Sequence, residues 1–286
     1  MKINWYFCSL SEKNMKKLFF LLIICISVFS CFSQNNDLFF YNRALDFKSK
    51  GQYGESLKDF DKAISINSKN SKSFFERAQI KILLKNEKGA LKDYNSCLSL
   101  NPTDTLALIQ RGLLKTAMND RRGAVKDFTK ALDLDDTNAE VYKYRAENKS
   151  ALSDHGGAIR DYSSYLHLSP DSIDALFLRA CSKIEMKDFI GAIEDLNGFI
   201  NINNIFVDSY IKRGIAYMEL NIYDKAMQDF NQAIKTDSKS AEAYYRRGIL
   251  HKKEGDTQSA CTDLSRAGEL GHKLAYGAIK VLCNNN

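Results

Sequence analysis

The amino-acid sequence predicts an all-α fold built as a solenoid of stacked helical hairpins. Three observations support this: a repeat of 34 residues, apolar residues spaced three and four apart inside each repeat, and few residues that break helices. The 286 residues include only 2 prolines and 15 glycines, which argues against a β-sandwich with frequent tight turns. A hydrophobic content of 44% and a mean hydropathy of −0.35 are typical of a chain that folds rather than one that stays disordered.

The repeat is clearest in the small residues that recur every 34 positions. Seven copies run from Asp37 to Leu274 without an insertion or deletion. Small residues at positions 8 and 20 should let two helices approach closely, and an aromatic residue or leucine at position 24 should fill the space beside them. Position 8 holds Ala44, Ala78, Gly112, Ala146, Ala180, Gly214 and Gly248, and position 24 holds Phe60, Tyr94, Phe128, Tyr162, Leu196, Phe230 and Leu264.

Capping residues divide each copy into two helices. The last position of a copy usually offers an N-cap for the next first helix, at Asn70, Asp104, Asn138, Ser172 and Ser240, with Phe206 as the exception. Residues that tolerate a left-handed backbone stand between the two helices, at Gly51, Asn119, Asn221 and Gly255. Asp120, Asp154, Asp188 and Asp256 follow as N-caps of second helices. Each copy is therefore an antiparallel hairpin that must stack on its neighbours to bury its apolar face.

These limits give the domain organisation. The repeats occupy 37–70, 71–104, 105–138, 139–172, 173–206, 207–240 and 241–274. Residues 1–33 form an N-terminal extension and signal peptide, 34–36 a short mature N-terminus, and 275–286 a C-terminal capping helix and tail. The helix is predicted from apolar residues at Leu274, Ala278, Val281 and Leu282.

The N-terminal segment is typical of export. Lys16 and Lys17 precede an apolar run from Leu18 to Phe29, which is shorter than the roughly 20 residues that span a membrane. Translation is expected to start at Met15. Cleavage after Ser33 predicts soluble export to the periplasm or cell envelope, whereas lipid attachment at Cys31 predicts a lipoprotein; a cytosolic protein with a misleading start is the third reading.

The pattern of small and aromatic residues resembles the tetratricopeptide repeat (TPR) family. Alanine at position 27, as in Ala63 and Ala131, and proline at position 32, as in Pro102 and Pro170, complete the resemblance. It implies a right-handed α-solenoid whose first helices line a concave groove for a peptide or a partner's helix. Two features depart from the family: its tryptophan near the start of the first helix is absent, and Tyr165 and Phe199 replace the alanine at position 27, which does not favour a uniform superhelix through repeats four and five.

The resemblance also implies that positions 5 and 9 of each repeat face the groove. The candidates for partner binding are Tyr41, Leu45, Phe75, Gln79, Ile109, Leu113, Phe177, Ile211, Ile215, Tyr245 and Ile249. This strip is mostly apolar, and only repeat four interrupts it, with Glu140, Lys143 and Glu147. An equal alternative is that Phe75, Ile109 and Ile211 simply pack against neighbouring first helices. The lysine and asparagine with which family members grip a terminal carboxylate do not occur together, so such a clamp is not expected.

An arginine at position 7 and an aspartate at position 23 occur in every copy. The set is Arg43, Arg77, Arg111, Arg145, Arg179, Arg213 and Arg247, with Asp59, Asp93, Asp127, Asp161, Asp195, Asp229 and Asp263. Because a guanidinium matches a carboxylate, we expect structural bridges, either within a repeat or to the next one. A ladder of cations for an acidic ligand is the alternative. An exposed bridge would contribute only about 0.2–1 kcal/mol.

No residues for catalysis are visible. His155, His167, His251 and His272 are not spaced as metal ligands and are interpreted as surface or loop residues, and no phosphate-binding loop or nucleophile elbow occurs. The net charge is +6, of which the first 33 residues supply +3, so nucleic acid is not an expected partner. We therefore expect a non-enzymatic scaffold without cofactor or metal that binds a protein or peptide, and that meets a membrane only through a lipid on Cys31. The alternative is an assembly factor that contacts partners through its convex face or repeat edges.

Two smaller features remain open. The basic residues Arg246, Lys252 and Lys253 form either a patch for an acidic segment or a solvated helix face. Among the cysteines after the signal, only Cys261 and Cys283 could meet, through the terminal helix folding onto repeat seven, and a disulfide there depends on an oxidising compartment.

Overall fold

The computed structural model describes residues 36–283, which contain helices and no strand. The prediction of an all-α fold is therefore confirmed for this part of the chain. The proposed start at Met15, the signal segment and Cys31 lie outside the described residues.

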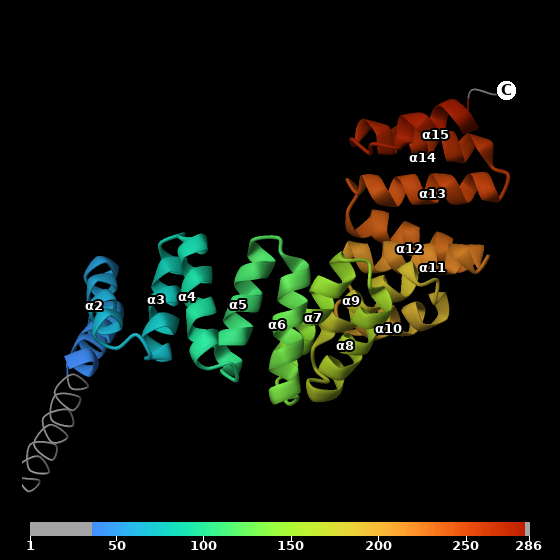
Figure 1. Cartoon of the computed structure of the whole chain (residues 1–286). Coiled ribbons are helices and arrows are strands. Elements are labelled where there is room, and N and C mark those ends of the chain that lie inside the picture. Colours follow the sequence, from blue (N-terminus) through green and yellow to red (C-terminus); the bar gives the residue numbers. More distant parts are fainter. Residues whose placement is uncertain (1–35, 284–286) are drawn as a thin grey trace, which may run out of the picture. The chain divides into compact units, whose positions relative to one another are not determined.

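Each repeat contributes a pair of helices, and Figure 1 labels those from α2 onward. The first helices are residues 36–49, α3 (Ser71–Leu83), α5 (Thr105–Ala117), α7 (Ala139–Ala151), α9 (Ile173–Glu185), α11 (Val207–Glu219) and α13 (Ala241–Lys253). The second helices are α2 (Tyr53–Ile66), α4 (Glu87–Leu100), α6 (Arg121–Leu134), α8 (His155–Leu168), α10 (Phe189–Ile202), α12 (Tyr223–Thr236) and α14 (Thr257–Glu269).

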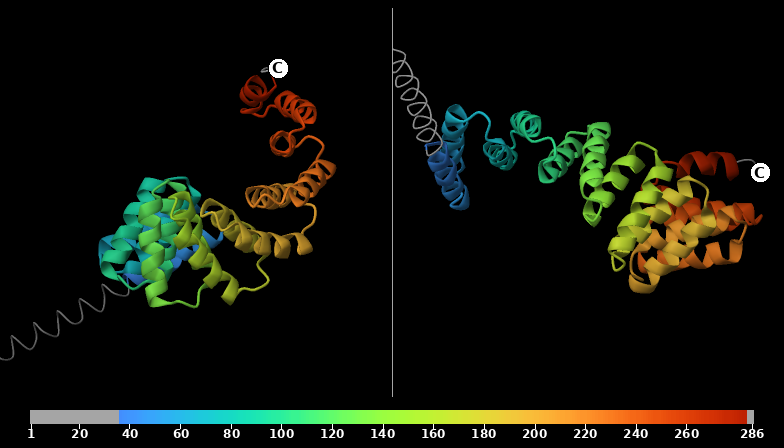
Figure 2. Two further views of the ribbon diagram at one scale, coloured as in Figure 1. Left: turned by 90° about the vertical axis from the view of Figure 1, so that its right-hand side faces the viewer. Right: turned by 60° about the horizontal axis from the view of Figure 1, so that its bottom comes forward.

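The described chain divides into two units, residues 36–114 and 115–283, with the division inside α5. In the first unit α3 packs against α2 and α4. In the second unit every helix from α6 to α15 packs against the next one, and first helices also contact each other across repeats, α9 with α11 and α11 with α13. Figure 2 shows this succession in the orange and red part of the chain, where consecutive helices lie side by side. Both units are thus stacks of hairpins, as an α-solenoid requires.

The turn inside each hairpin has the predicted backbone. Asn119 and Asn221 have φ of 63° and 59°, and Gly51 and Gly255 have φ of 72° and 90°. Lys85, Ser153 and Lys187 adopt the same left-handed conformation at the equivalent position, so the turn geometry holds even where the sequence has no glycine or asparagine.

Capping follows the expected residues in most repeats. Asp120, Asp154, Asp188 and Asp256 each accept a hydrogen bond from the backbone N–H three residues later. Among the caps of first helices, Asn70, Asp104 and Ser240 also accept such a bond. Ser172 instead donates its hydroxyl to the Tyr165 hydroxyl at 3.0 Å, and Phe206 has no polar atom to offer.

Small residues bring the two helices of a hairpin into contact, as the sequence predicts. The alanine or glycine at position 8 and the side chain at position 24 are buried in every repeat. A Cβ atom placed on Gly214 would lie 2.6 Å from Cε1 of Phe230, so the α11–α12 packing needs glycine there. The core is therefore a continuous seam between first and second helices, with no single globular centre within either unit.

The short helix α15 (Ala275–Leu282) packs against α14. The Tyr276 ring lies on Gly268, where an added Cβ would approach the ring to 3.1 Å. A disulfide joins Cys261 in α14 to Cys283 at the end of α15, with the two Cα atoms 5.8 Å apart. The pairing that the sequence leaves open is thus present in the structure.

None of the helices in the described region combines the length and the apolar composition that crossing a membrane requires.

Candidate functional site

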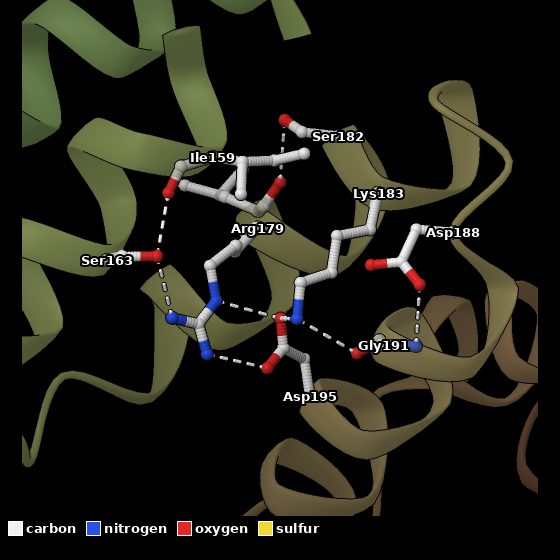
Figure 3. A network of polar contacts seen from close by, with 9 residues as sticks. Ile159, Ser163, Arg179, Ser182, Lys183, Asp188, Gly191 and Asp195 are labelled. Carbon is white, nitrogen blue, oxygen red and sulfur yellow. Dashed lines mark hydrogen bonds and ion pairs between the residues drawn. The ribbon is translucent and has the colours of Figure 1, made fainter. Parts of the chain in front are cut away.

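The arginine and aspartate of a repeat meet within that repeat. Nε and Nη2 of the arginine each donate a hydrogen bond to one oxygen of the aspartate sixteen residues later, in a two-pronged pair. In repeat five, Arg179 reaches Asp195 at 2.9 and 2.7 Å (Figure 3). The same pair forms at Arg43, Arg77, Arg145, Arg213 and Arg247.

The remaining arginine nitrogen reaches back into the previous repeat. Nη1 of Arg179 donates to Ser163 Oγ at 3.0 Å, and Nη1 of Arg111 donates to Asn95 Oδ1 at 2.8 Å. An acceptor oxygen stands at this position, the twenty-fifth, in every copy: Asp61, Asn95, Thr129, Ser163, Asn197, Asn231 and Ser265. The acceptor at position 25 is therefore a sequence signal for a link between repeats, which the arginine and aspartate alone do not reveal.

A second cation supports the aspartate in four repeats. Lys81, Lys115, Lys149 and Lys183, all at position 11, lie 2.7–2.9 Å from Asp93, Asp127, Asp161 and Asp195. Repeat six has Tyr217 at this position, and repeat seven has His251, whose Nε2 lies 3.8 Å from Asp263. Arg213 is thus the cation that pairs with Asp229 at 2.7 Å.

These bridges are not surface pairs. The aspartate side chains are only 2–8% exposed, so the small contribution expected of an exposed bridge does not apply. Burial raises the pKa of Asp229 above its ordinary value, against the opposing effect of Arg213. At Asp59, by contrast, the Arg43 hydrogen bonds outweigh burial and lower the pKa. Because every described arginine of the set has protein partners, a free ladder of cations for an acidic ligand is not available.

The predicted groove residues are largely taken up by packing. Ile211 is 3% exposed, Phe75 8% and Ile109 9%. Ile211 lies in a core cluster with Phe199 and Tyr210, and the Phe75 ring lies 5.8 Å from that of Tyr94. Partly buried positions complete the set: Tyr41, Leu45, Gln79, Leu113, Phe177, Ile215, Tyr245 and Ile249. A continuous, fully exposed apolar strip is therefore absent from the described residues.

A pocket opens where repeat four meets repeat five, inside the second unit. We call it the aromatic pocket, and it encloses about 380 Å³. Its lining consists of Lys143, Glu147, Asp174, Phe177, Leu178, Phe199, Asn203 and Phe206. Concave sites with an apolar lining and a few polar groups are the usual form of binding sites. Of the candidate partner-binding residues Phe177 takes part, together with Lys143 and Glu147, which occupy groove positions of repeat four.

Three phenylalanine rings form one wall of the aromatic pocket. The centroid of Phe177 lies 5.4 Å from that of Phe199 and 5.1 Å from that of Phe206, and Phe199 lies 5.5 Å from Phe206. Phe199 is 3% exposed, whereas Phe206 is 38% exposed. Phe199 replaces the usual small residue at position 27, and Phe206 replaces the usual N-cap. The two departures of repeat five from the repeat pattern therefore converge on the same pocket.

The polar side of the aromatic pocket carries both charges. Burial raises the pKa of Glu147, while the nearby Lys143 opposes this shift and Glu140 adds to it. The Lys143 ammonium lies over the Tyr165 ring, 5.8 Å from its centroid. Tyr165 in turn donates its hydroxyl to Glu140 Oε1 at 3.0 Å. The bulky Tyr165 thus contacts both Lys143 and Glu140 at the polar edge of the pocket, and the equally bulky Phe199 forms part of its apolar wall.

The C-terminal basic patch is partly occupied. Arg246 bonds to Glu242 at 2.6 Å, and Lys252 Nζ contacts Thr257 Oγ1 at 3.1 Å. His272 lies in a loop, as predicted, but its ring stacks on Tyr245 at 4.0 Å and bonds to Glu242 at 2.9 Å. Burial raises the pKa of Glu242, whereas its contacts with Arg246 and His272 lower it. The net effect is a pKa below the ordinary value.

A second hollow, of about 490 Å³, lies elsewhere in the second unit. Asp136, Thr137, Tyr142, Ser163, Ser164, His167 and Leu168 line it. It is larger than the aromatic pocket, but Tyr142 and His167 are the only rings in its lining, and Ser163 is already bonded to Arg179. We therefore take the aromatic pocket as the candidate site. Within residues 36–283, no group of histidine, cysteine or acidic side chains is arranged to hold a metal ion.

The repeat pattern placed Lys143, Glu147 and Phe177 at groove positions but did not join them to the rest of this pocket. Leu178 and Asn203 carried no distinguishing signal, because neither type nor spacing marks them. Phe199 and Phe206 were visible as departures from the repeat, and that shared anomaly is the signal that could have found the site.

Comparison with known proteins agrees with this architecture. Models described as tetratricopeptide repeat match residues 39–70 and 71–104, and one described as TPR repeat matches residues 214–255. No curated protein sequence matches the chain.

Several solved structures share the fold. The C-terminal part of a TPR repeat-containing protein from Cytophaga hutchinsonii has a TM-score of 0.66 at 15% identity and covers 84% of this chain and 99% of its own. A TPR protein from Parabacteroides merdae has a TM-score of 0.56 at 18% identity, covering 87% and 100%. YrrB, described as a TPR protein with an unusual peptide-binding site, has a TM-score of 0.56 at 19% identity, covering 65% and 97%. From the matched repeats, the unbroken 34-residue period and these shared folds, we conclude that the chain is a tetratricopeptide-repeat protein.

Proposed function

We propose that this protein is an exported, non-enzymatic scaffold that binds a segment of another protein in the aromatic pocket. The fold supports this, because stacked helical hairpins offer extended surfaces for partners. A similar solved protein, YrrB, is described as having a peptide-binding site. The pocket has room for one or two side chains, with rings for apolar contact and charged groups beside them.

The observation that carries the proposal is the placement of Phe206. At this position repeats one to four and six have asparagine, aspartate or serine, and three of those residues cap the next helix. Phe206 makes no cap hydrogen bond, and its ring is 38% exposed beside the pocket. Loss of an N-cap destabilises a helix by about 1 kcal/mol, so a half-exposed ring at this point is more readily explained by contact with a partner than by stability alone.

Site-specific photocrosslinking tests this proposal. A photoreactive phenylalanine analogue placed at Phe206 in the native cell should form adducts with a partner protein, and mass spectrometry should identify the attached peptide. Adduct formation should fall when Phe177 is also replaced by alanine, because the ring wall is then incomplete.

A matched position on the second helix α10 serves as the control. Ile190 is 65% exposed and lies outside the pocket lining. An analogue at Ile190 should give few adducts. Adducts at Ile190 and none at Phe206 would favour the alternative, an assembly factor that contacts partners through its convex face or repeat edges. Ile190 and Ile202 of α10 are exposed and therefore available for such a contact.

Export is tested separately, by fractionation and determination of the mature N-terminus. A chain that begins just after Ser33 indicates soluble export, and a lipid-modified Cys31 indicates a lipoprotein. A full-length chain in the cytosol would contradict export without affecting the pocket.

A further inference from the structure

The charges around the aromatic pocket indicate which kind of segment it accepts. We propose that the occupant is a cationic segment, in which an aliphatic or aromatic side chain enters the pocket and flanking lysine or arginine residues meet its acidic edge. This rests on the proposed function and adds the chemistry of the ligand.

The first observation is a row of carboxylates at the start of consecutive first helices. Position 2 is acidic in repeats four to seven, at Glu140, Asp174, Asp208 and Glu242. In repeats one to three the same position holds Leu38, Lys72 and Leu106. Acidic residues stabilise the N-terminal turn of a helix, which explains why position 2 tolerates them. The helix dipole does not explain why they occur only in repeats four to seven, because every first helix has it.

The second observation is that the two middle carboxylates of this row are unpaired. Glu140 accepts the Tyr165 hydroxyl, and Glu242 bonds to Arg246 and His272. Asp174 and Asp208 are exposed, and neither forms an ion pair with a cation of residues 36–283. Asp174 lines the aromatic pocket, and Asp208 lies two residues after Phe206. One of the two unpaired charges therefore lies in the pocket lining, and the other lies in the first turn of α11, the helix that follows Phe206.

The other charges at the pocket do not favour an anion. Lys143 is the cation in the lining, and it lies over the Tyr165 ring and within one helical turn of Glu147. Lys212 follows Asp208 by one turn without forming an ion pair with it. The balance of Glu147, Asp174 and Asp208 against Lys143 and Lys212 is negative, and like charges at an interface exclude partners.

Selection from random peptides tests the proposal with the full chain. A library of phage-displayed 12-residue peptides is selected on the wild-type protein and depleted on the Phe206→Ser variant. The enriched peptides should contain an apolar residue flanked by lysine or arginine. Affinities of synthetic, end-blocked versions are then measured by fluorescence polarisation.

The variants separate charge from packing. The double variant Asp174→Asn with Asp208→Asn should weaken the enriched peptides about tenfold, and added salt should reduce this difference. Asp224→Asn, which removes the exposed first-turn carboxylate of α12, is the matched control and should leave affinity unchanged. Lys143→Gln should raise affinity, because it removes a cation from the pocket lining that opposes a cationic ligand; lower affinity would contradict the proposal.

The outcomes distinguish this inference from the proposed function. Enriched peptides that are acidic or neutral, bind the Asp174→Asn and Asp208→Asn variant equally well and are lost on Phe206→Ser would overturn the cationic ligand while leaving the pocket as the binding site. If no peptide depends on Phe206, the proposed function fails as well.

Discussion

Repeats five and six have the same length and the same helix limits, yet they differ at three positions that matter. In repeat five, Lys183 adds a second cation to Asp195, and Phe199 and Phe206 build the aromatic pocket. In repeat six the same positions hold Tyr217, Ala233 and Ser240, and Ser240 caps α13. Repeat five thus has two cations on its aspartate and ends at an uncapped boundary lined with rings. Repeat six has one cation on its aspartate and ends at a capped boundary with a small residue at position 27. The difference indicates that repeat five departs from the repeat pattern at its boundary while it keeps the second cation on its aspartate.

The largest expected effect comes from removing the arginine in each repeat. Arg213→Leu leaves Asp229 buried without its cation and should destabilise the protein by about 3–5 kcal/mol. Arg179→Leu leaves Lys183 at 2.9 Å from Asp195 and should cost about 1.5–3 kcal/mol. Urea unfolding followed by far-UV circular dichroism measures both.

The lysine can be tested by transplantation. Tyr217→Lys in the Arg213→Leu background should recover about 1 kcal/mol, whereas Tyr217→Leu should recover nothing. Equal losses for the two arginine variants, with no rescue, would show that the position-11 lysines do not support the aspartates.

Exchange of the capping residues should have a smaller effect. Ser240→Phe removes a cap from α13 and should lower stability by about 1 kcal/mol. Phe206→Ser creates a cap for α11 while it loses the contacts with Phe177 and Phe199, so the two changes partly cancel. Thermal unfolding should show the larger loss of stability for Ser240→Phe; a much larger loss for Phe206→Ser would assign the ring a structural role.

The smallest expected effect is a dependence on pH. Because burial raises the pKa of Asp229 in the folded state, the native chain binds this proton more tightly than the unfolded chain. The contribution of Asp229 to stability is therefore greatest below its unfolded pKa of about 3.9 and is lost as the pH rises through its raised value. Asp59, with a lowered pKa, acts in the opposite sense and loses its contribution as the pH falls.

Comparing wild type with Asp229→Asn in urea titrations over this acidic range isolates the effect. The stability difference between the two proteins should change with pH in favour of the variant as the pH rises. A constant difference would contradict the raised pKa.

Local rules in the sequence were enough to predict the fold. The period, the left-handed turn residues and the aspartate caps each depend on neighbours within a few residues, and they are found as expected. Arg179 and Asp195 are also close in sequence, so their meeting was foreseeable.

The candidate site was less predictable because it depends on contacts across a repeat boundary. Whether Ile211 is a groove residue or a core residue depends on how tightly α11 packs on its neighbours, which no pattern in one repeat reveals. The pocket needs Lys143 from repeat four and Phe206 from the end of repeat five, which are brought together only by stacking.

The arginine that holds two repeats together has a consequence for how arrays of this kind change in length. Arg179 contacts Ser163 sixteen residues before it and Asp195 sixteen residues after it. The same two intervals are used by Arg77, Arg145, Arg213 and Arg247. Duplication or excision of one whole repeat by recombination would therefore rejoin an arginine to an equivalent acceptor and leave no orphaned charge at the junction. A shift by any other number of residues would strand a buried carboxylate, so the network permits growth only in complete units.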